Sequence, residues 1–242
     1  MNQLALPLKL QDHAVFDSFH AAGNDALFAF LLEISVIPSG PGCFLWGAPA
    51  SGKTHLLQAV CERAGDQSVY LSMRALCEAG ADVLQGMAGR RFVCLDDLQV
   101  VAGSHDWEIA LFTLCNQLAD NAGVLVISSA APPKESGIAL ADLESRMSLL
   151  PVFHTIVLPE NERVRALKMR AGFRGLDLPD ETANYLLSRA RRDMSSLYQL
   201  LDRLDTEAMI AKRRLTIPFV REVLGNHLAP LSRSENSREF TR

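Results

Sequence analysis

The residues at positions 47–54 have the types and the spacing of a phosphate-binding loop. The run Gly47-Ala-Pro-Ala-Ser-Gly52-Lys53-Thr54 matches the pattern G-x-x-x-x-G-K-[ST] at every fixed position. Glycines let the backbone curl so that consecutive N–H groups point at a phosphate, and the positive end of the following helix adds to their field. Lys53 would neutralise the β- and γ-phosphates and Thr54 would ligate Mg²⁺. The pattern predicts a nucleotide site, although a glycine turn that happens to carry a lysine would also match it.

An acidic pair at the end of a later apolar run supplies the other half of such a site. The run Phe92-Val-Cys-Leu-Asp96-Asp97 has the form of a Walker B strand. Asp96 would hold Mg²⁺ through water, and Asp97 would orient or polarise an attacking water. Any strand that runs into a polar loop looks similar, so the prediction depends on the phosphate loop that precedes it.

The elements that position these residues follow from the hydrophobic pattern. Short apolar runs alternate with segments of helical period, which indicates a parallel sheet covered on both faces. These runs are residues 42–46, 68–71, 92–95, 124–127 and 155–158. The later part of the chain is helical throughout, with helices expected at 163–171, 179–191, 194–210 and 218–224. We therefore expect an α/β domain at 11–158 and a helical lid at 159–228, with a separate peptide at 1–10 and a disordered tail at 229–242.

Composition limits the partners and the compartment. A formal net charge of −4 over 242 residues gives no general attraction to nucleic acid, so we expect contact with DNA only through another protein. The five cysteines are scattered and predict buried, reduced thiols. The longest apolar stretch, 26–38, contains Glu33 and is too short to cross a bilayer, and the chain shows no signal peptide. We expect a cytoplasmic protein without a membrane contact.

The motifs together resemble a known family. The run 45–57 around the phosphate loop, the run Leu95-Asp-Asp-Leu-Gln99 and the entry to the lid are similar to the AAA+ module of the bacterial replication initiator DnaA, over roughly residues 12 to 226. The resemblance implies a P-loop AAA+ fold that binds ADP or ATP with Mg²⁺, in which Thr54 and Asp96 serve the metal. The cofactor-binding residues that it implies are Gly47, Pro49, Ala50, Ser51, Gly52, Lys53, Thr54, His55 and Asp96.

The end of the resemblance points to one branch of this family. DnaA-type initiators continue into a basic helix-turn-helix domain that reads origin DNA, and we expect no such domain here. The run 215–224 is similar to the corresponding segment of the Hda-type regulators, which inactivate DnaA. The resemblance therefore implies DnaA as a partner.

The first residues favour the same branch. Gln3, Leu4, Leu6, Pro7 and Leu8 are similar to the short peptides that bind the DNA polymerase sliding clamp, which Hda-type proteins carry in this position. Proline holds the peptide extended, so the leucines can enter an apolar cleft at little entropic cost, while the glutamine hydrogen-bonds at the rim. The alternative is an apolar start that folds back onto its own domain.

A finger-like arginine follows in the run Asp142-Leu-Glu-Ser-Arg146-Met147, which resembles the arginine-finger segment of DnaA relatives. Such a guanidinium reaches the γ-phosphate on a neighbouring subunit and stabilises charge in the transition state. The resemblance implies that Arg146 acts in trans. The alternative is a simple ion pair with Asp142 or Glu144 on the same helix.

Two departures from the family pattern weaken the chain's own hydrolysis. After the fourth predicted strand, Ala130 stands in a run where proteins of the DnaA family have a polar sensor and an acidic residue. In the lid, Ser195 stands where the family usually has an arginine that contacts the nucleotide, and the nearby Arg192 could take over that role. We expect a regulator that docks on the DNA-loaded clamp and stimulates hydrolysis of ATP on DnaA, with weak or absent ATPase activity of its own. A self-sufficient ATPase such as a helicase-loading factor, and a clamp-binding adaptor with a structural nucleotide site, stay open, as does a homo-oligomer.

Overall fold

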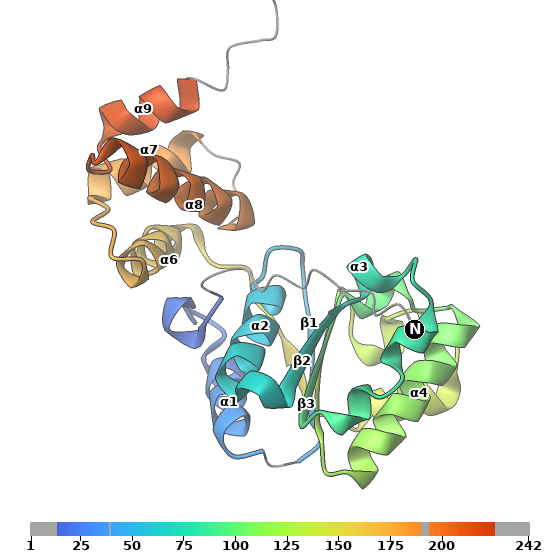
Figure 1. Ribbon diagram of the computed structural model, residues 1–242. Coiled ribbons are helices and arrows are strands. Elements are labelled where there is room, and N and C mark those ends of the chain that lie inside the picture. Colours follow the sequence, from blue (N-terminus) through green and yellow to red (C-terminus); the bar gives the residue numbers. More distant parts are fainter. Residues whose placement is uncertain (1–13, 39, 190–193, 226–242) are drawn as a thin grey trace, which may run out of the picture. The chain divides into compact units, whose positions relative to one another are not determined.

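The computed structural model describes residues 14–38, 40–189 and 194–225 (Figure 1). The predicted clamp peptide, the predicted tail and Arg192 lie outside these residues. Contacts within the chain divide it into two compact units, the first ending at Met169 and the second beginning at Arg170. The division falls inside helix α6 (Glu160–Phe173).

The first unit is built on a five-stranded parallel sheet with the order β2-β3-β4-β1-β5. Strand β1 pairs with β4 from Gly42 opposite Leu125, and β3 pairs with β4 from Phe92 opposite Val124. The strands are β1 (Gly42–Trp46), β2 (Ser68–Ser72), β3 (Phe92–Asp96), β4 (Val124–Ser129) and β5 (Val152–His154). The predicted parallel sheet is confirmed, and all its carboxyl ends meet at one edge.

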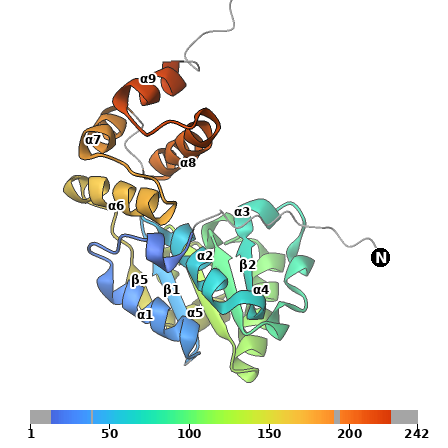
Figure 2. The same ribbon diagram turned by 60° about the vertical axis from the view of Figure 1, so that its left-hand side comes forward.

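Helices cover both faces of this sheet because alternate strand residues point to opposite sides. Cys43 and Leu45 pack with α1 (Asp25–Val36) and α2 (Lys53–Ala64) on one face of the sheet. Phe44, the residue between them, packs with the helical layer on the opposite face. Figures 1 and 2 show the sheet between these two layers. The opposite layer contains α3 (Met73–Leu76), α4 (His105–Asp120) and α5 (Ala141–Ser148). Short 3₁₀ turns lie at Phe16–Ser18, Gly65–Gln67, Ala81–Leu84, Met87–Gly89, Leu98–Val100 and Pro133–Glu135.

The prediction for the fifth strand is wrong in its position. The strand is β5 (Val152–His154), not residues 155–158. Its ladder ends where Thr155 donates its N–H to the carbonyl oxygen of Trp46 at 2.7 Å. At the next residue the side chain of Asn24 binds both backbone groups of Ile156, at 2.8 and 3.0 Å, so these groups cannot continue the sheet. Past the strand Thr155 is buried, whereas the side chains of Ile156 and Val157 are exposed, so this apolar run is not part of the sheet.

The cysteine prediction is correct for three of the five residues. All five thiols are free; Cys43, Cys61 and Cys94 are buried, but Cys77 and Cys115 are partly exposed. Cys77 directly follows the short helix α3, where its thiol donates to the Arg74 carbonyl oxygen at 3.5 Å. Burial raises the pKa of Cys43 well above its ordinary value.

In the described parts of the chain, no helix combines the length and the apolar character that a bilayer span requires.

The second unit is helical, as predicted. Its helices are the last turn of α6, α7 (Asp180–Arg189), α8 (Met194–Ala211) and α9 (Ile217–Gly225). The guanidinium of Arg170 is buried, lies 4.5 Å from the centre of the Tyr198 ring and pairs with Asp202 at 3.5 Å. Arg174 pairs with the same carboxylate at 2.7 Å. The apolar core consists of Leu178, Ala183, Leu186, Leu197, Leu201, Leu204, Leu215, Phe219 and Val220, among others.

Candidate functional site

The predicted phosphate loop connects β1 to α2 at the carboxyl edge of the sheet. Gly52 precedes α2 and has a φ of 94°, a backbone conformation that residues with a side chain rarely adopt. A Cβ atom on Gly52 would lie 2.7 Å from the Phe19 ring, and one on Gly47 would lie 2.5 Å from the carbonyl oxygen of Thr155. Both glycines are therefore required by close packing around the loop. Pro49 and Ala50 lie on its exposed rim.

Lys53 lies at the centre of this loop. Its ammonium group donates hydrogen bonds to the carbonyl oxygens of Gly47 at 2.7 Å and Ala48 at 2.9 Å, and the Ser51 hydroxyl lies at 3.5 Å. Burial lowers the pKa of Lys53, while the charges of Asp96 and Asp97 oppose that shift. Within residues 14–38, 40–189 and 194–225, no carboxylate lies within ion-pair distance of this ammonium. A buried cation that lacks a direct anionic partner fits a phosphate group.

Thr155 supports the loop from the end of β5. Its hydroxyl lies 2.6 Å from the hydroxyl of Ser51 and donates to the Trp46 carbonyl oxygen at 3.1 Å. Sequence reasoning missed this role, because it assigned Thr155 to a strand. The ring of His55 contacts the segment before α1, with Nε2 2.9 Å from the Val15 carbonyl oxygen. His55 therefore anchors that segment to α2.

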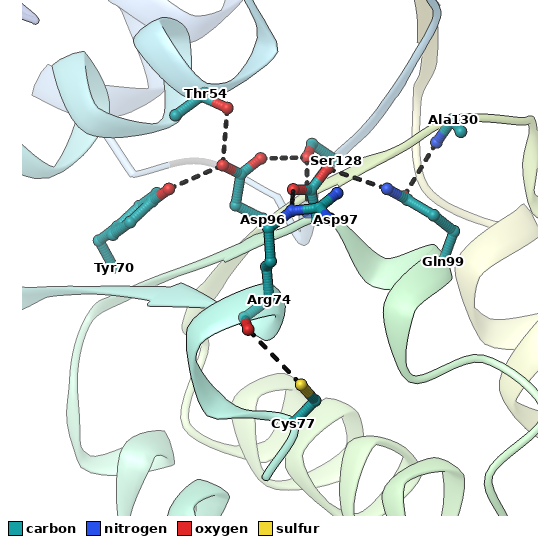
Figure 3. A network of polar contacts seen from close by, with 9 residues as sticks. All are labelled: Thr54, Tyr70, Arg74, Cys77, Asp96, Asp97, Gln99, Ser128 and Ala130. Carbon is teal, nitrogen blue, oxygen red and sulfur yellow. Dashed lines mark hydrogen bonds and ion pairs between the residues drawn. The ribbon is translucent and has the colours of Figure 1, made fainter. Parts of the chain in front are cut away.

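Asp96 joins the loop to the sheet (Figure 3). One of its oxygens, Oδ2, accepts hydrogen bonds from Thr54 Oγ1 and from the Tyr70 hydroxyl, both at 2.7 Å. The other oxygen, Oδ1, accepts from the hydroxyl of Ser128. Burial and the charge of Asp96 raise the pKa of Tyr70 well above its ordinary value, so its hydroxyl stays a donor at neutral pH. The structure thus brings together Thr54 and Asp96, the two predicted metal-site residues, and adds two hydroxyl groups.

Asp97 has a different set of partners. It has a φ of 62°, and its carboxylate accepts hydrogen bonds from Arg74 Nε at 3.2 Å and from Gln99 Nε2 at 2.9 Å. The Gln99 oxygen accepts the N–H of Ala130 at 3.0 Å (Figure 3). The backbone N–H of Asp97 donates to Ser128 Oγ at 3.0 Å. The carboxylate of Asp97 is therefore fixed by hydrogen bonds from Arg74 and Gln99.

These residues fit a nucleotide with Mg²⁺. The loop lies at the carboxyl edge of the sheet beside β1, where the order of the strands reverses and where α/β sheets bind ligands. Backbone N–H groups and a buried ammonium suit phosphates, while hydroxyl and carboxylate oxygens suit Mg²⁺. Among the described residues no group of three or more His, Cys, Asp or Glu side chains could hold a metal alone. Oxygens of the ligand would complete the coordination of a cation here.

Arg146 lies on α5 at a different place. Its side chain is exposed, and in the described part of the chain it pairs with neither Asp142 nor Glu144. It stands at the rim of an apolar cleft of about 200 Å³ that reaches the amino ends of β1 and β4. Other residues of this cleft include Pro41, Cys115, Leu118, Gly123, Leu149 and Leu150. The phosphate loop lies at the opposite edge of the sheet, roughly 20 Å from Pro41 to Gly47 along β1 at about 3.3 Å per residue.

Burial raises the pKa of the Cys115 thiol to about 11, and the positive charge of Arg146 partly opposes that shift. The guanidinium is therefore close enough to Cys115 to act on it through its field. Arg146 thus faces the cleft rim rather than the phosphate loop of its own chain.

Glu108 fixes the start of the helix that carries Arg146. Its buried carboxylate accepts hydrogen bonds from the backbone N–H groups of Gly103 at 2.7 Å, Ala139 at 2.9 Å and Leu140 at 2.7 Å. Burial alone would raise the pKa of Glu108, but these three donors outweigh it and lower the pKa. Leu140 is the residue before α5. Sequence reasoning missed Glu108, because an acid in the first turn of a helix is typical of any helix start.

Models of known protein families match two successive parts of the chain. The model of the bacterial DnaA ATPase domain matches residues 10–150, more than half of the chain. This chain belongs to the DnaA-related AAA+ family. The model of the Hda lid domain matches residues 160–224, which contain helices α6 to α9. The predicted relationship to the Hda and DnaA branch of AAA+ proteins is therefore confirmed.

Solved structures agree on the fold of this AAA+ chain. Domain III of the replication initiation protein DnaA from Thermotoga maritima has a TM-score of 0.71 at 19% identity, covering 90% of this chain and 98% of its own. AMPPCP-bound DnaA from Aquifex aeolicus has a TM-score of 0.65 at 21% identity, with 81% of this chain and 66% of that one covered. The RuvB Holliday junction branch migration motor from Thermotoga maritima has a TM-score of 0.59 at 15% identity, with coverages of 86% and 69%. The AAA+ architecture with a helical lid is thus established.

Proposed function

We propose that this chain is a negative regulator of replication initiation that binds the DNA-loaded sliding clamp and stimulates hydrolysis of ATP bound to DnaA. The observation that carries the proposal is the position of Arg146. Its side chain is exposed and lies at the amino edge of the sheet, away from the phosphate loop of its own chain. A guanidinium at that edge can reach the nucleotide bound by a partner subunit and stabilise the charge of its transition state, as arginine fingers do. Membership of the DnaA-related family and the Hda-type lid support DnaA as that partner.

The chain's own nucleotide, in this proposal, is ADP or ATP with Mg²⁺. The loop 47–54, the buried ammonium of Lys53 and the contact between Thr54 and Asp96 support this, as does the AMPPCP bound to a DnaA of similar fold. The hydrogen bonds that engage Asp97 with Arg74 and Gln99 support slow hydrolysis in this chain. Its nucleotide then serves as a switch, and turnover takes place on the partner. We place this regulator in the cytoplasm.

The contact with the clamp is assigned to the first residues. In this proposal Leu4, Leu6 and Leu8 would offer alternating apolar side chains to an apolar cleft of the clamp, to which the peptide would bind in an extended form. Gln3 would hydrogen-bond at the rim of that cleft, and Pro7 would favour the extended form. DNA is reached only through the clamp, in keeping with a net charge of −4. A homo-oligomer is compatible with this arrangement.

The test measures loss of radiolabelled ATP from DnaA in the presence of this chain, the clamp and DNA, with each component omitted in turn. We expect hydrolysis only with all of them. Stimulation without the clamp would contradict the clamp requirement. Rapid hydrolysis of ATP by this chain alone would instead support a self-sufficient ATPase such as a helicase-loading factor.

Arg146→Ala isolates the finger in the same assay. Stimulated hydrolysis should fall by about a hundredfold or more, the low side of what arginine fingers contribute. Binding of ADP and thermal stability should not change, because an exposed arginine contributes little to folding. Arg63→Ala, which removes an exposed arginine from the last turn of α2, is the matched control. Near-wild-type stimulation by Arg146→Ala would assign the effect to another residue, or would leave a clamp-binding adaptor with a structural nucleotide site.

A further inference from the structure

The carboxylate of Asp96 is held from both sides by hydroxyl groups that the phosphate-loop motif does not include. Tyr70 donates to Oδ2 at 2.7 Å, and Ser128 donates to Oδ1. We propose that Tyr70 and Ser128 are positioning residues that orient Asp96 toward the Mg²⁺ of a bound nucleotide. This inference rests on the proposed function only in that the chain binds a nucleotide with Mg²⁺.

The geometry shows why Tyr70 can do this. Strands β2 and β3 are parallel, with Tyr70 opposite Cys94 and Ser72 opposite Asp96. Tyr70 and Asp96 are thus diagonal neighbours on one face of the sheet, a separation that a long aromatic side chain bridges. The hydroxyl therefore reaches Asp96 from the side of β2, across the end of the strand that carries the acid (Figure 3).

Ser128 holds the carboxylate from the other neighbouring strand. It lies on β4, which pairs with β3 up to Leu95 opposite Ile127, so Ser128 stands beside Asp96 at the end of that ladder. Its oxygen also accepts the N–H of Asp97 at 3.0 Å, which leaves its hydrogen for Asp96. A serine that is fully buried and bonded on both sides leaves the carboxylate little rotation.

Thr54 explains why these two hydroxyls are needed when the site is loaded. Its hydroxyl now donates to Asp96 Oδ2, yet the same hydroxyl is the predicted ligand of Mg²⁺. If it turns toward the cation, Tyr70 supplies the hydrogen bond that Oδ2 keeps. Groups that orient metal-binding residues in this way typically change metal affinity by about 10- to 100-fold.

The experiment measures the dissociation constant of fluorescent ADP in Mg²⁺ and in EDTA for the wild type and for Tyr70→Phe, which removes one oxygen atom. We expect the gain in affinity that Mg²⁺ gives to fall by about tenfold in Tyr70→Phe, while affinity in EDTA stays within twofold of the wild type. Tyr185→Phe is the matched control, because its hydroxyl lies in the second unit and accepts a hydrogen bond from Arg221. It should leave both constants unchanged.

Ser128→Ala tests the same proposal from the other oxygen, and should also reduce the Mg²⁺-dependent gain. If Tyr70→Phe is not folded, Ser128→Ala decides the outcome. In the background of Asp96→Asn, neither variant should have a further effect, because both act through that carboxylate. An unchanged Mg²⁺-dependent gain in both variants overturns the inference.

The two proposals fail in different ways in this experiment. If Lys53→Ala weakens ADP binding while Tyr70→Phe and Ser128→Ala keep the full Mg²⁺ effect, only the positioning role is wrong. If the wild type binds no ADP at all, the nucleotide site of the proposed function is wrong, and the positioning role is wrong with it.

Discussion

The ammonium group of Lys53 donates a 2.7 Å hydrogen bond to the carbonyl oxygen of Gly47, the first residue of the loop in which both lie. This contact closes the loop on itself and gives the buried charge a partial partner. A phosphate that enters the loop offers the same ammonium a full negative charge. Replacing the contact with the carbonyl oxygen by a contact with the phosphate therefore favours binding of the ligand. The lysine is thus placed for an anion before the anion binds.

Lys53→Ala should therefore weaken ADP and ATP binding sharply, by at least about a hundredfold, because a charge-assisted contact is removed from a site made otherwise of backbone dipoles. The fold should be retained, since the change deletes a buried cation that has no ion pair among the described residues. Calorimetric titration checks this, with Lys134→Ala, an exposed lysine in the turn Pro133–Glu135, as control. Unchanged affinity for both nucleotides would refute the assignment of the loop.

Replacing Leu6 and Leu8 by alanine should abolish binding to the sliding clamp. The two side chains are the expected anchors, and truncation of an anchor at a binding site costs about 2 kcal/mol or more. Nucleotide affinity should not change. Surface plasmon resonance with immobilised clamp measures the effect, and Gln11→Ala, just beyond the predicted peptide, is the control. Equally strong clamp binding by the double variant would exclude this peptide as the docking segment.

Glu108→Gln should destabilise the first unit by about 1–3 kcal/mol at pH 7, because the amide cannot accept all three backbone N–H groups. The pKa of Glu108 is lowered in the folded state, so its stabilising effect is complete above the ordinary carboxyl pKa. It disappears as the pH falls through the lowered value. The difference from the wild type should therefore shrink between neutral pH and about pH 3.

Urea midpoints at several pH values check this prediction. Glu78→Gln, at an exposed acid, should follow the wild type throughout. A constant difference between Glu108→Gln and the wild type over the whole range would show that the ionised carboxylate is not the stabilising form.

Asp202→Ala should destabilise the second unit by about 2–3 kcal/mol. Its carboxylate pairs with the guanidinium groups of Arg170 and Arg174. Arg174 keeps a second partner in Asp205 at 3.4 Å, so the cost arises mainly from the buried charge of Arg170, which loses its pairing with Asp202. We place the cost below the full range for buried pairs because Asp202 is itself partly exposed. Thermal unfolding measures it, and Asp177→Ala, at an exposed acid in the same unit, is the control. Equal melting of Asp202→Ala and the wild type would mean that the arginines find other partners.

The local parts of this protein were predictable from the sequence. The phosphate loop, the alternation of strands and helices, and the pair Asp96-Asp97 each depend on residues close together in the chain, whose backbone conformation and hydrophobic period are local properties. The helices of the second unit were also predicted nearly to their ends. The family followed from these motifs.

Only the tertiary structure decided what surrounds them. Strand β5 ends early because Asn24 binds the backbone of Ile156 across 132 residues, and no hydrophobic pattern contains that contact. Tyr70 and Ser128 reach Asp96 from two other strands, so their roles depend on the register of the sheet. The place of Arg146 at the edge opposite its own phosphate loop depends in the same way on how the helices pack. Hydrogen bonds and packing between distant segments form only when the whole domain has folded, which is why a linear motif predicts the chemistry of a site but not its complete set of residues.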